Sequence, residues 1–178
     1  MKTLQDKLGK FEMEPTPPAN FCDHIGNKTI KIINSEYWGE LDAKNQANGY
    51  GILISSGEDI YEGYFLNDKR HYRGRHLNKD GSHYEGEWEA DREDGRGVFK
   101  NPKDGKEYAG EWNQGREQGR GKMIFPSGNT YKGKFYKGLR DGNGVFIWDK
   151  KVTKSKWNNA DKAKGDFSGL EVDSYRYD

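Results

Sequence analysis

The sequence contains very little cysteine, no long hydrophobic run and almost no net charge. Cys22 is the only cysteine among 178 residues, which excludes an intramolecular disulfide framework and a cluster of thiolate metal ligands. No stretch approaches the roughly 20 apolar residues of a transmembrane helix. Met1–Lys7 lacks the apolar run that a signal peptide needs. We therefore expect an intracellular protein.

The chain is also poor in apolar residues, yet it is rich in glycine and aromatic residues. The 30 Lys and Arg residues nearly balance the 29 Asp and Glu residues, so no global field would attract nucleic acid or an anionic membrane. Hydrophobic residues make up only 31% of the chain, which is too little for a thick core. The 24 glycines and 13% aromatics nevertheless distinguish it from a disordered polyelectrolyte. This composition indicates a thin sheet held together by a few large rings.

A Tyr-x-Gly motif recurs every 23 or 24 residues and reveals an internal repeat. The five copies begin at Tyr37, Tyr61, Tyr84, Tyr108 and Tyr131. A Gly-x-Gly motif follows at a fixed offset, beginning at Gly49, Gly95, Gly119 and Gly142, whereas the second copy keeps only Gly74. Chance does not preserve such a register, so the repeat is a structural unit.

Each copy reads as strand, loop, strand and tight turn. Side chains alternate between the two faces of a strand, so Tyr84, Gly86 and Trp88 share one face. Asp80-Gly81 and Asp104-Gly105 are dipeptides that two-residue hairpin turns favour. The pattern predicts an all-β fold: an elongated, single-layer antiparallel sheet of successive hairpins with short terminal caps. A β-sandwich or barrel with glycine-rich turns is the alternative.

The segment from Tyr37 to Trp148 resembles MORN (membrane occupation and recognition nexus) repeats, whose pattern is Tyr-x-Gly-x-Trp followed by spaced glycines. The resemblance implies a twisted, grooved sheet and a structural or scaffold role. It also implies a setting in the ciliary or flagellar axoneme, where radial spokes carry similar repeats, or in another cytoskeletal assembly. The sequence departs from the pattern at Leu41, where an aromatic residue is usual, and at Gly74–Leu77, where an apolar strand is usual.

The regions outside the repeats suggest four segments. We expect residues 1–28 to form a tail with a Pro-rich spacer and residues 29–36 to form a capping strand. Residues 37–150 hold the five repeats. Residues 151–178 form a C-terminal cap or tail, in which a short helix or a folded-back segment follows the last repeat. In the tail, Leu4, Leu8 and Phe11 fall on one face of a helix. A docking helix and a frayed terminus are both compatible with this spacing.

One face of the predicted sheet carries a ladder of aromatic rings, which we predict to bind a helix or an extended peptide of a partner protein. The predicted contact residues are Tyr61, Phe65, Tyr84, Trp88, Tyr108, Trp112, Tyr131 and Phe135. In the alternative interpretation these rings only stack on one another. A homodimer is also compatible with the sequence, with the Leu4, Leu8 and Phe11 segment as a docking helix for a second copy of the chain.

The irregular second copy is locally basic, with Lys69, Arg70, Arg73 and Arg75 close together in sequence. Such a patch would contact an acidic partner or the phosphates of lipid headgroups. The alternative is an ordinary solvated strand. This patch is the basis of a second functional hypothesis, a membrane-associated tether that binds acidic phospholipids.

No motif assembles a catalytic, cofactor or metal site. Gly115–Met123 superficially matches a phosphate loop, but Arg116 stands where the first glycine belongs and Met123 where Ser or Thr must hold the metal. His71, His76 and His83 cluster only in sequence, and ordinary surface histidines explain them. We therefore predict a protein that is not an enzyme and binds neither cofactor nor metal.

Overall fold

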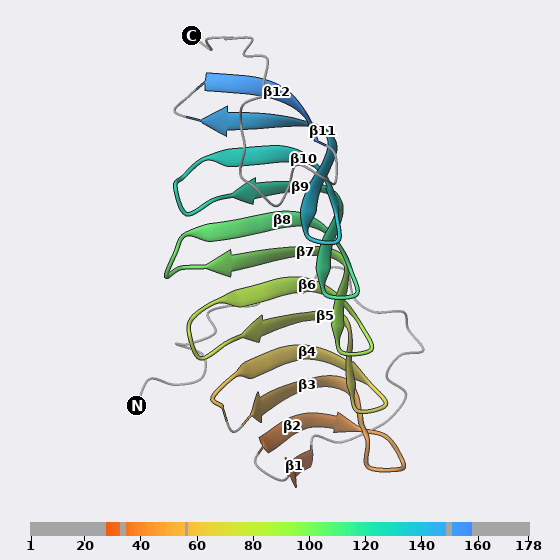
Figure 1. Cartoon of the computed structure of the whole chain (residues 1–178). Coiled ribbons are helices and arrows are strands. Elements are labelled where there is room, and N and C mark those ends of the chain that lie inside the picture. Colours follow the sequence, from red (N-terminus) through yellow and green to blue (C-terminus); the bar gives the residue numbers. More distant parts are fainter. Residues whose placement is uncertain (1–27, 33–34, 56, 149–150, 158–178) are drawn as a thin grey trace.

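The computed structural model describes residues 28–32, 35–55, 57–148 and 151–157, which form one open antiparallel sheet of twelve strands (Figure 1). The strands pair in chain order, so each inner strand lies between its two neighbours in sequence. The described residues contain no helix, and hence none long and apolar enough to span a membrane. The predicted all-β single-layer sheet is confirmed, and the sandwich or barrel alternative is wrong.

Each repeat supplies a strand with the Tyr-x-Gly motif and a following strand with the Gly-x-Gly motif. The strands are β1 Lys28–Ile32, β2 Ser35–Leu41, β3 Ala47–Ser55, β4 Ile60–Leu66, β5 Lys69–Leu77, β6 His83–Glu89, β7 Arg92–Asn101, β8 Lys106–Asn113, β9 Arg116–Ile124, β10 Thr130–Tyr136, β11 Leu139–Trp148 and β12 Lys151–Trp157.

The two ends of the sheet are strands. β1 pairs with β2, so the segment 29–36 divides between two strands, and the C-terminal segment expected to form a short helix or to fold back adds β12 to the edge of β11. The tail with Leu4, Leu8 and Phe11, the Pro-rich spacer and residues 158–178 lie outside the described residues.

A row of glycines crosses the sheet, one on each strand from β2 to β11. This glycine row comprises Gly39, Gly51, Gly63, Gly74, Gly86, Gly97, Gly110, Gly121, Gly133 and Gly144, each directly opposite the next. The tyrosine of each repeat lies against a pair of them, and a Cβ atom on Gly97 would come within 2.2 Å of Oη of Tyr84. Only glycine leaves room for a ring so close to the backbone.

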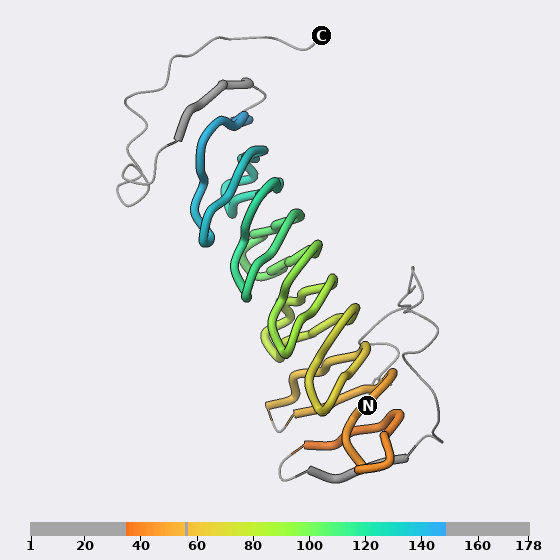
Figure 2. Tube along the Cα trace, turned by 90° about the vertical axis from the view of Figure 1, so that its right-hand side faces the viewer, coloured from red at the N-terminus to blue at the C-terminus, as the bar shows by residue number. Residues whose placement is uncertain are grey.

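Strands β2, β4, β6, β8 and β10 shift register just after the glycine row. Such bulges bend a strand, and the hairpin ends swing toward one side of the sheet (Figures 1 and 2). The tyrosine holds the bend, because its hydroxyl donates to the carbonyl oxygen three residues later, as from Tyr84 to Glu87 at 2.9 Å. We call the face inside the bend the inner face and the opposite one the outer face.

Nine rings interlock edge to face along the inner face. In order of contact this ring ladder comprises Tyr37, Phe65, Tyr61, Trp88, Tyr84, Trp112, Tyr108, Phe135 and Tyr131. Neighbouring centroids lie 4.9 to 5.3 Å apart, with interplanar angles of 80° to 89°. Each such pair contributes about 0.5–1.5 kcal/mol beyond the burial of area. The ladder therefore joins all five repeats into one core.

A second row of inner-face side chains fills the gaps between the tyrosines. Its members are Leu53, His76, Phe99, Met123 and Phe146. His76 is the one polar member and lies 6.1 Å from the Trp88 ring, centroid to centroid. Burial, reinforced by the positive charge of Arg70, lowers the pKa of His76 below its ordinary value. The folded protein therefore favours the neutral imidazole.

Two-residue turns at the hairpin ends link neighbouring repeats. Asn67-Asp68 and Ala90-Asp91 have two successive positive φ values, as in type I′ turns. The N–H of the second turn residue donates to a carbonyl oxygen of the preceding repeat, as from Asp91 to Arg70 at 3.0 Å. Asp68, Gly115 and Gly138 form the equivalent bond. These bonds fix the position of each bent hairpin end on its neighbour.

Substitution of one member of the glycine row is expected to destabilise the whole array. The Cβ atom of Gly97→Ala would overlap the Tyr84 ring, and overpacking of this kind costs about 1–3 kcal/mol. Gly57→Ala is the matched control, because a Cβ atom there would meet nothing closer than 3.7 Å. The urea midpoint, followed by tryptophan fluorescence, should fall for Gly97→Ala alone. Equal midpoints for Gly97→Ala and wild type would contradict this role of the glycine row.

Replacement of His76 by phenylalanine, the residue at the equivalent position 99, is expected to stabilise the protein most in acid. At a pH above about 6.5 both the folded and the unfolded state hold a neutral imidazole, so no proton is taken up on unfolding. At lower pH the unfolded state binds a proton that the folded state resists, because the folded pKa is lowered. Wild-type stability should then fall by up to about 1.4 kcal/mol per pH unit down to the folded pKa.

The measurement compares urea midpoints of wild type and His76→Phe at pH 7.5 and pH 5.5. The stability gap between the two proteins should widen at the lower pH. A gap of the same size at both pH values would show that the buried imidazole does not resist protonation.

Candidate binding surfaces

The eight aromatic residues predicted to contact a partner form the core of the molecule instead. Tyr61, Phe65, Tyr84, Trp88, Tyr108, Trp112, Tyr131 and Phe135 expose between 0% and 9% of their surface. The bend after the glycine row brings the rings of the two strand halves together, so each ring covers its neighbours. The expectation of an exposed aromatic face is therefore wrong, and the stacking interpretation describes these rings.

The polar atoms of the ring ladder are also occupied. Burial raises the pKa of the hydroxyls of Tyr61, Tyr84 and Tyr108, which therefore stay protonated and serve as hydrogen-bond donors. The indole Nε1 of Trp88 donates to the carbonyl oxygen of Gly74 at 3.0 Å. Trp112 donates to Gly97 at 3.2 Å. These polar groups tie each repeat to the one before it.

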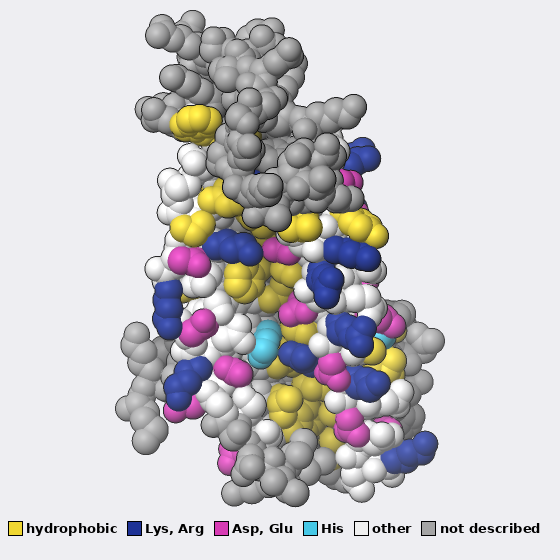
Figure 3. All heavy atoms as spheres, in the orientation of Figure 1, with side chains coloured by type: hydrophobic (Ala, Val, Ile, Leu, Met, Phe, Trp, Pro, Cys, Tyr) yellow, Lys and Arg dark blue, Asp and Glu magenta, His cyan; other side chains and the backbone are white. Residues whose placement is uncertain are grey.

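Some apolar side chains of the inner face remain partly exposed. Leu53, Phe99 and Phe125 pack against the buried rings and keep one side toward solvent, and we call them the inner strip. Figure 3 shows hydrophobic side chains gathered along the middle of this face, with charged side chains on both sides. The inner strip is thus an accessible apolar surface on a rigid support.

A row of charges lies beside the inner strip, one on each odd-numbered strand from β5 to β11. This inner charge row comprises Arg70, Glu93, Glu117 and Arg140, each opposite a ladder ring on the preceding strand. The guanidinium carbon of Arg70 lies 4.4 Å from the Trp88 ring centroid, and that of Arg140 lies 5.8 Å from Tyr131. The row therefore places two carboxylates between two cations that stack on aromatic rings, and Oε1 of Glu117 also lies 3.4 Å from Nζ of Lys106.

The predicted basic patch is divided by the fold. Arg70 belongs to the inner face, where its Nε lies 3.2 Å from a carboxylate oxygen of Asp91. Arg75 belongs to the outer face, is only 9% exposed and places Nη2 2.7 Å from Glu62. Lys69, at the exposed start of β5, and Arg73 also fall on the outer face. Strand alternation therefore separates Arg70 from the other three cations, of which Arg75 is already paired.

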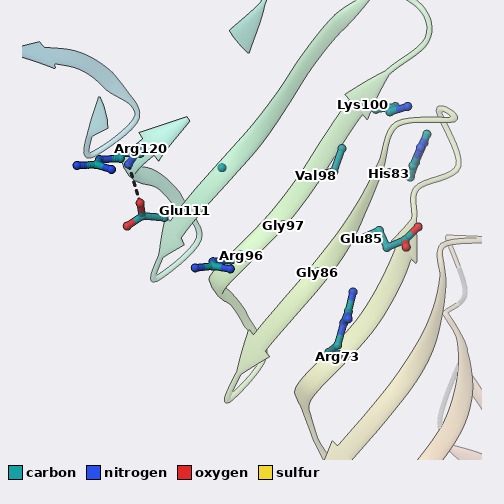
Figure 4. A pocket seen from close by; sticks show the side chains of 11 residues that line it. Arg73, His83, Glu85, Gly86, Arg96, Gly97, Val98, Lys100, Glu111 and Arg120 are labelled. Atoms are coloured by element: carbon teal, nitrogen blue, oxygen red, sulfur yellow. Dashed lines mark hydrogen bonds between the residues drawn. The ribbon is translucent and has the colours of Figure 1, made fainter. Parts of the chain in front are cut away.

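A hollow of about 590 Å³ lies on the outer face and crosses β5 to β9. Its floor is the backbone of Gly86, Gly97 and Gly110, whose Cβ positions face the inner rings. One wall holds Arg73, Arg96, Glu111 and Arg120, and the other holds His83, Glu85, Val98 and Lys100 (Figure 4). We call this hollow the outer furrow.

The sequence analysis did not single out Arg96 and Arg120. The signal was nevertheless present, because an arginine precedes the second glycine of the pair in three successive repeats, at Arg73, Arg96 and Arg120. Strand alternation then places all three on the same face. The significance of the pattern is visible only when the glycine row is recognised as the floor of a furrow.

The three clustered histidines separate in the structure. His71 and His83 lie on the outer face and His76 on the inner face. Among the described residues, no group of three or more histidine, cysteine or carboxylate side chains is placed to hold a metal ion.

Thirty chains of solved structures resemble this one. The chain is similar to the TCP domain of SAS-4 (dCPAP) of Drosophila melanogaster, solved in complex with a proline-rich motif of Ana2 (dSTIL). The two share 11% identity over 85% of this chain and 88% of that chain, with a TM-score of 0.42, which is too low to carry an argument. No curated protein matches the sequence.

The family comparison agrees with the geometry. The MORN repeat model matches residues 61–82, 84–106, 108–130 and 131–151, together half of the chain. The preceding hairpin, β2 and β3, was not matched but has the same construction, with Gly39 opposite Gly51 and the Tyr37 hydroxyl 2.8 Å from the carbonyl oxygen of Glu40. The recurring tyrosine, the glycine row and the ring ladder together show that the chain belongs to the MORN repeat family.

Proposed function

We propose that the chain is a non-enzymatic scaffold protein that holds a segment of a partner protein along its inner face. The observation that carries this proposal is the inner strip, an apolar surface left partly exposed on a core that the ring ladder makes rigid. Apolar surface of this kind, bordered by charges, is typical of interaction sites. Contact with the partner would fall to Leu53, Phe99 and Phe125 rather than to the buried rings.

The inner charge row supplies the specificity. Neighbouring members stand two strands apart, so the spacing is about 9.6 Å and the row from Arg70 to Arg140 is about 29 Å long. A helix of about 19 residues covers that length, and an extended peptide covers it with about nine. Arg70 and Glu117 are already paired within the chain, with Asp91 and Lys106. A partner segment with a cation opposite Glu93 and apolar side chains on the strip would therefore complement the inner face.

Family analogy supports a place for this scaffold in a cytoskeletal assembly, with the ciliary or flagellar axoneme as the expected one. The membrane-tether alternative loses support, because Arg70 lies on the opposite face from the other three cations, and Arg70 and Arg75 are paired with carboxylates. A homodimer is a further possible assembly, and sedimentation of the purified chain would detect it.

The test uses two neighbouring residues on opposite faces. Phe99→Ala removes the centre of the inner strip, and Val98→Ala is the matched control on the outer face. Wild type and each variant serve as bait in native extracts. The segment of each retained protein that binds is then made as a synthetic peptide, and its affinity for wild type and for each variant is measured. Peptide affinity should fall at least tenfold for Phe99→Ala, about 1.4 kcal/mol, and stay within twofold for Val98→Ala.

A second inner-face variant keeps the proposal testable if Phe99→Ala fails to fold. Glu93→Lys reverses one charge of the inner charge row without removing apolar packing, and it should also weaken peptide binding about tenfold. Circular dichroism establishes that each variant is folded. Folded Phe99→Ala and Glu93→Lys proteins that retain every partner at full affinity would rule out the inner face as the docking surface.

A further inference from the structure

We propose that the outer furrow is a second binding site, which takes an acidic protein segment in the polyproline II conformation with a carboxylate at every third residue. This site lies on the face opposite the inner strip and does not depend on the function proposed above. Arg73, Arg96 and Arg120 would each bind one carboxylate of the segment. The glycine row would form the surface on which the backbone of the segment lies.

The three arginines are available for a ligand. They lie on β5, β7 and β9, in one line along one wall of the furrow (Figure 4). Among the residues that the structure describes, no carboxylate forms an ion pair with any of the three guanidinium groups. The nearby carboxylate of Glu111 accepts the backbone N–H of Arg120 at 3.0 Å and leaves the guanidinium open. Such groups bind carboxylates in a bidentate manner.

The charge of the surroundings favours an anionic ligand. Arg73, Arg96, Arg120 and Lys100 give the lining four positive charges against two negative ones from Glu85 and Glu111. Further cations stand on the outer face toward the C-terminal repeats, although Asp141 on β11 lies opposite one of them. They are Lys122 on β9 and Lys132 and Lys134 on β10, all exposed. A segment that extends toward the C-terminal repeats would therefore meet further cations.

The spacing of the arginines selects the conformation of the ligand. Strands lie about 4.8 Å apart, so arginines on every second strand recur at about 9.6 Å and span about 19 Å in all. A polyproline II helix has three residues per turn and rises about 3.1 Å per residue, which repeats a side chain on one face every 9.3 Å or so. Two turns advance about 18.6 Å, about 0.6 Å less than the two arginine intervals of about 9.6 Å each.

Other regular conformations match less well. In an extended strand the side chains of one face recur every 6.8 Å or so, and the third residue points to the opposite face. In an α-helix the seventh residue returns to the same face after about 10.5 Å, which accumulates a mismatch of about 2 Å over the three arginines. Of these three conformations, polyproline II gives the carboxylate spacing that is closest to the spacing of the arginines.

The test measures fluorescence anisotropy of labelled synthetic peptides with the full-length protein. The spaced peptide contains five Glu-Pro-Pro units, and the block peptide has the same composition with all five glutamates together. The spaced peptide should bind at least tenfold more tightly than the block peptide at equal net charge. Equal affinity for the two peptides would overturn the register argument and with it the proposal.

Two triple variants separate the furrow from general electrostatics. Arg73→Glu with Arg96→Glu and Arg120→Glu reverses the three furrow charges and should abolish binding of the spaced peptide. The matched control, Lys69→Glu with Arg92→Glu and Arg116→Glu, makes the same charge change at the first residues of the same three strands. It should retain binding within threefold. Equal losses in both variants would overturn the proposal.

The remaining controls concern folding, membranes and the inner face. A milder triple variant combines Arg73→Gln, Arg96→Gln and Arg120→Gln. Its affinity for the spaced peptide should also fall at least tenfold, and its circular dichroism spectrum should not change. Binding of vesicles of phosphatidylcholine and phosphatidylserine through the same arginines, without binding of the spaced peptide, would assign the furrow to a lipid surface and overturn the proposal. Phe99→Ala should bind the spaced peptide normally, so a failure of the inner-face function leaves this test intact.

Discussion

The structure depends on the contact between a tyrosine ring and a pair of glycines on adjacent strands. The ring lies so close to the backbone that a Cβ atom at Gly97 or Gly121 would stand within 2.5 Å of it. From this position the hydroxyl donates to a carbonyl oxygen past the bend, and burial keeps that hydroxyl protonated. One contact, repeated five times, thus bends the strands and places the rings where they interlock. A sheet one layer thick gains a dry core in this way.

The same contact gives the two faces different capacities for recognition. On the inner face the bend encloses the rings, so only the side chains around them, such as Phe99 and the members of the inner charge row, reach solvent. On the outer face the backbone of the glycine row forms a floor between two rows of outward side chains. The repeat therefore places a ligand-accessible group at a constant interval on each face, although the groups differ from one copy to the next.

Much of the fold follows from local pattern. The recurrence of Tyr-x-Gly and the alternation of faces were enough to predict hairpin strands in chain order, because antiparallel neighbours need only short turns. The pattern was less informative at the ends. Lys151–Trp157 forms β12 although its sequence lacks the motif, since the exposed edge of β11 offers backbone partners to any extended segment. The pattern also failed for Arg70 and Arg75, which stand five positions apart in the sequence but point to opposite faces and meet different carboxylates.

The sequence by itself determined the number of repeats, the side of the strand on which each ring stands and the positions where no side chain is tolerated. These are properties of spacing and residue size. Only the tertiary structure decided whether the rings are exposed or buried, because that depends on the bend after the glycine row, which brings Tyr84 and Trp88 to 5.2 Å although four positions separate them on one strand. It also decided that Arg73, Arg96 and Arg120 share one furrow, because strand pairing aligns residues that lie 23 or 24 positions apart in the chain.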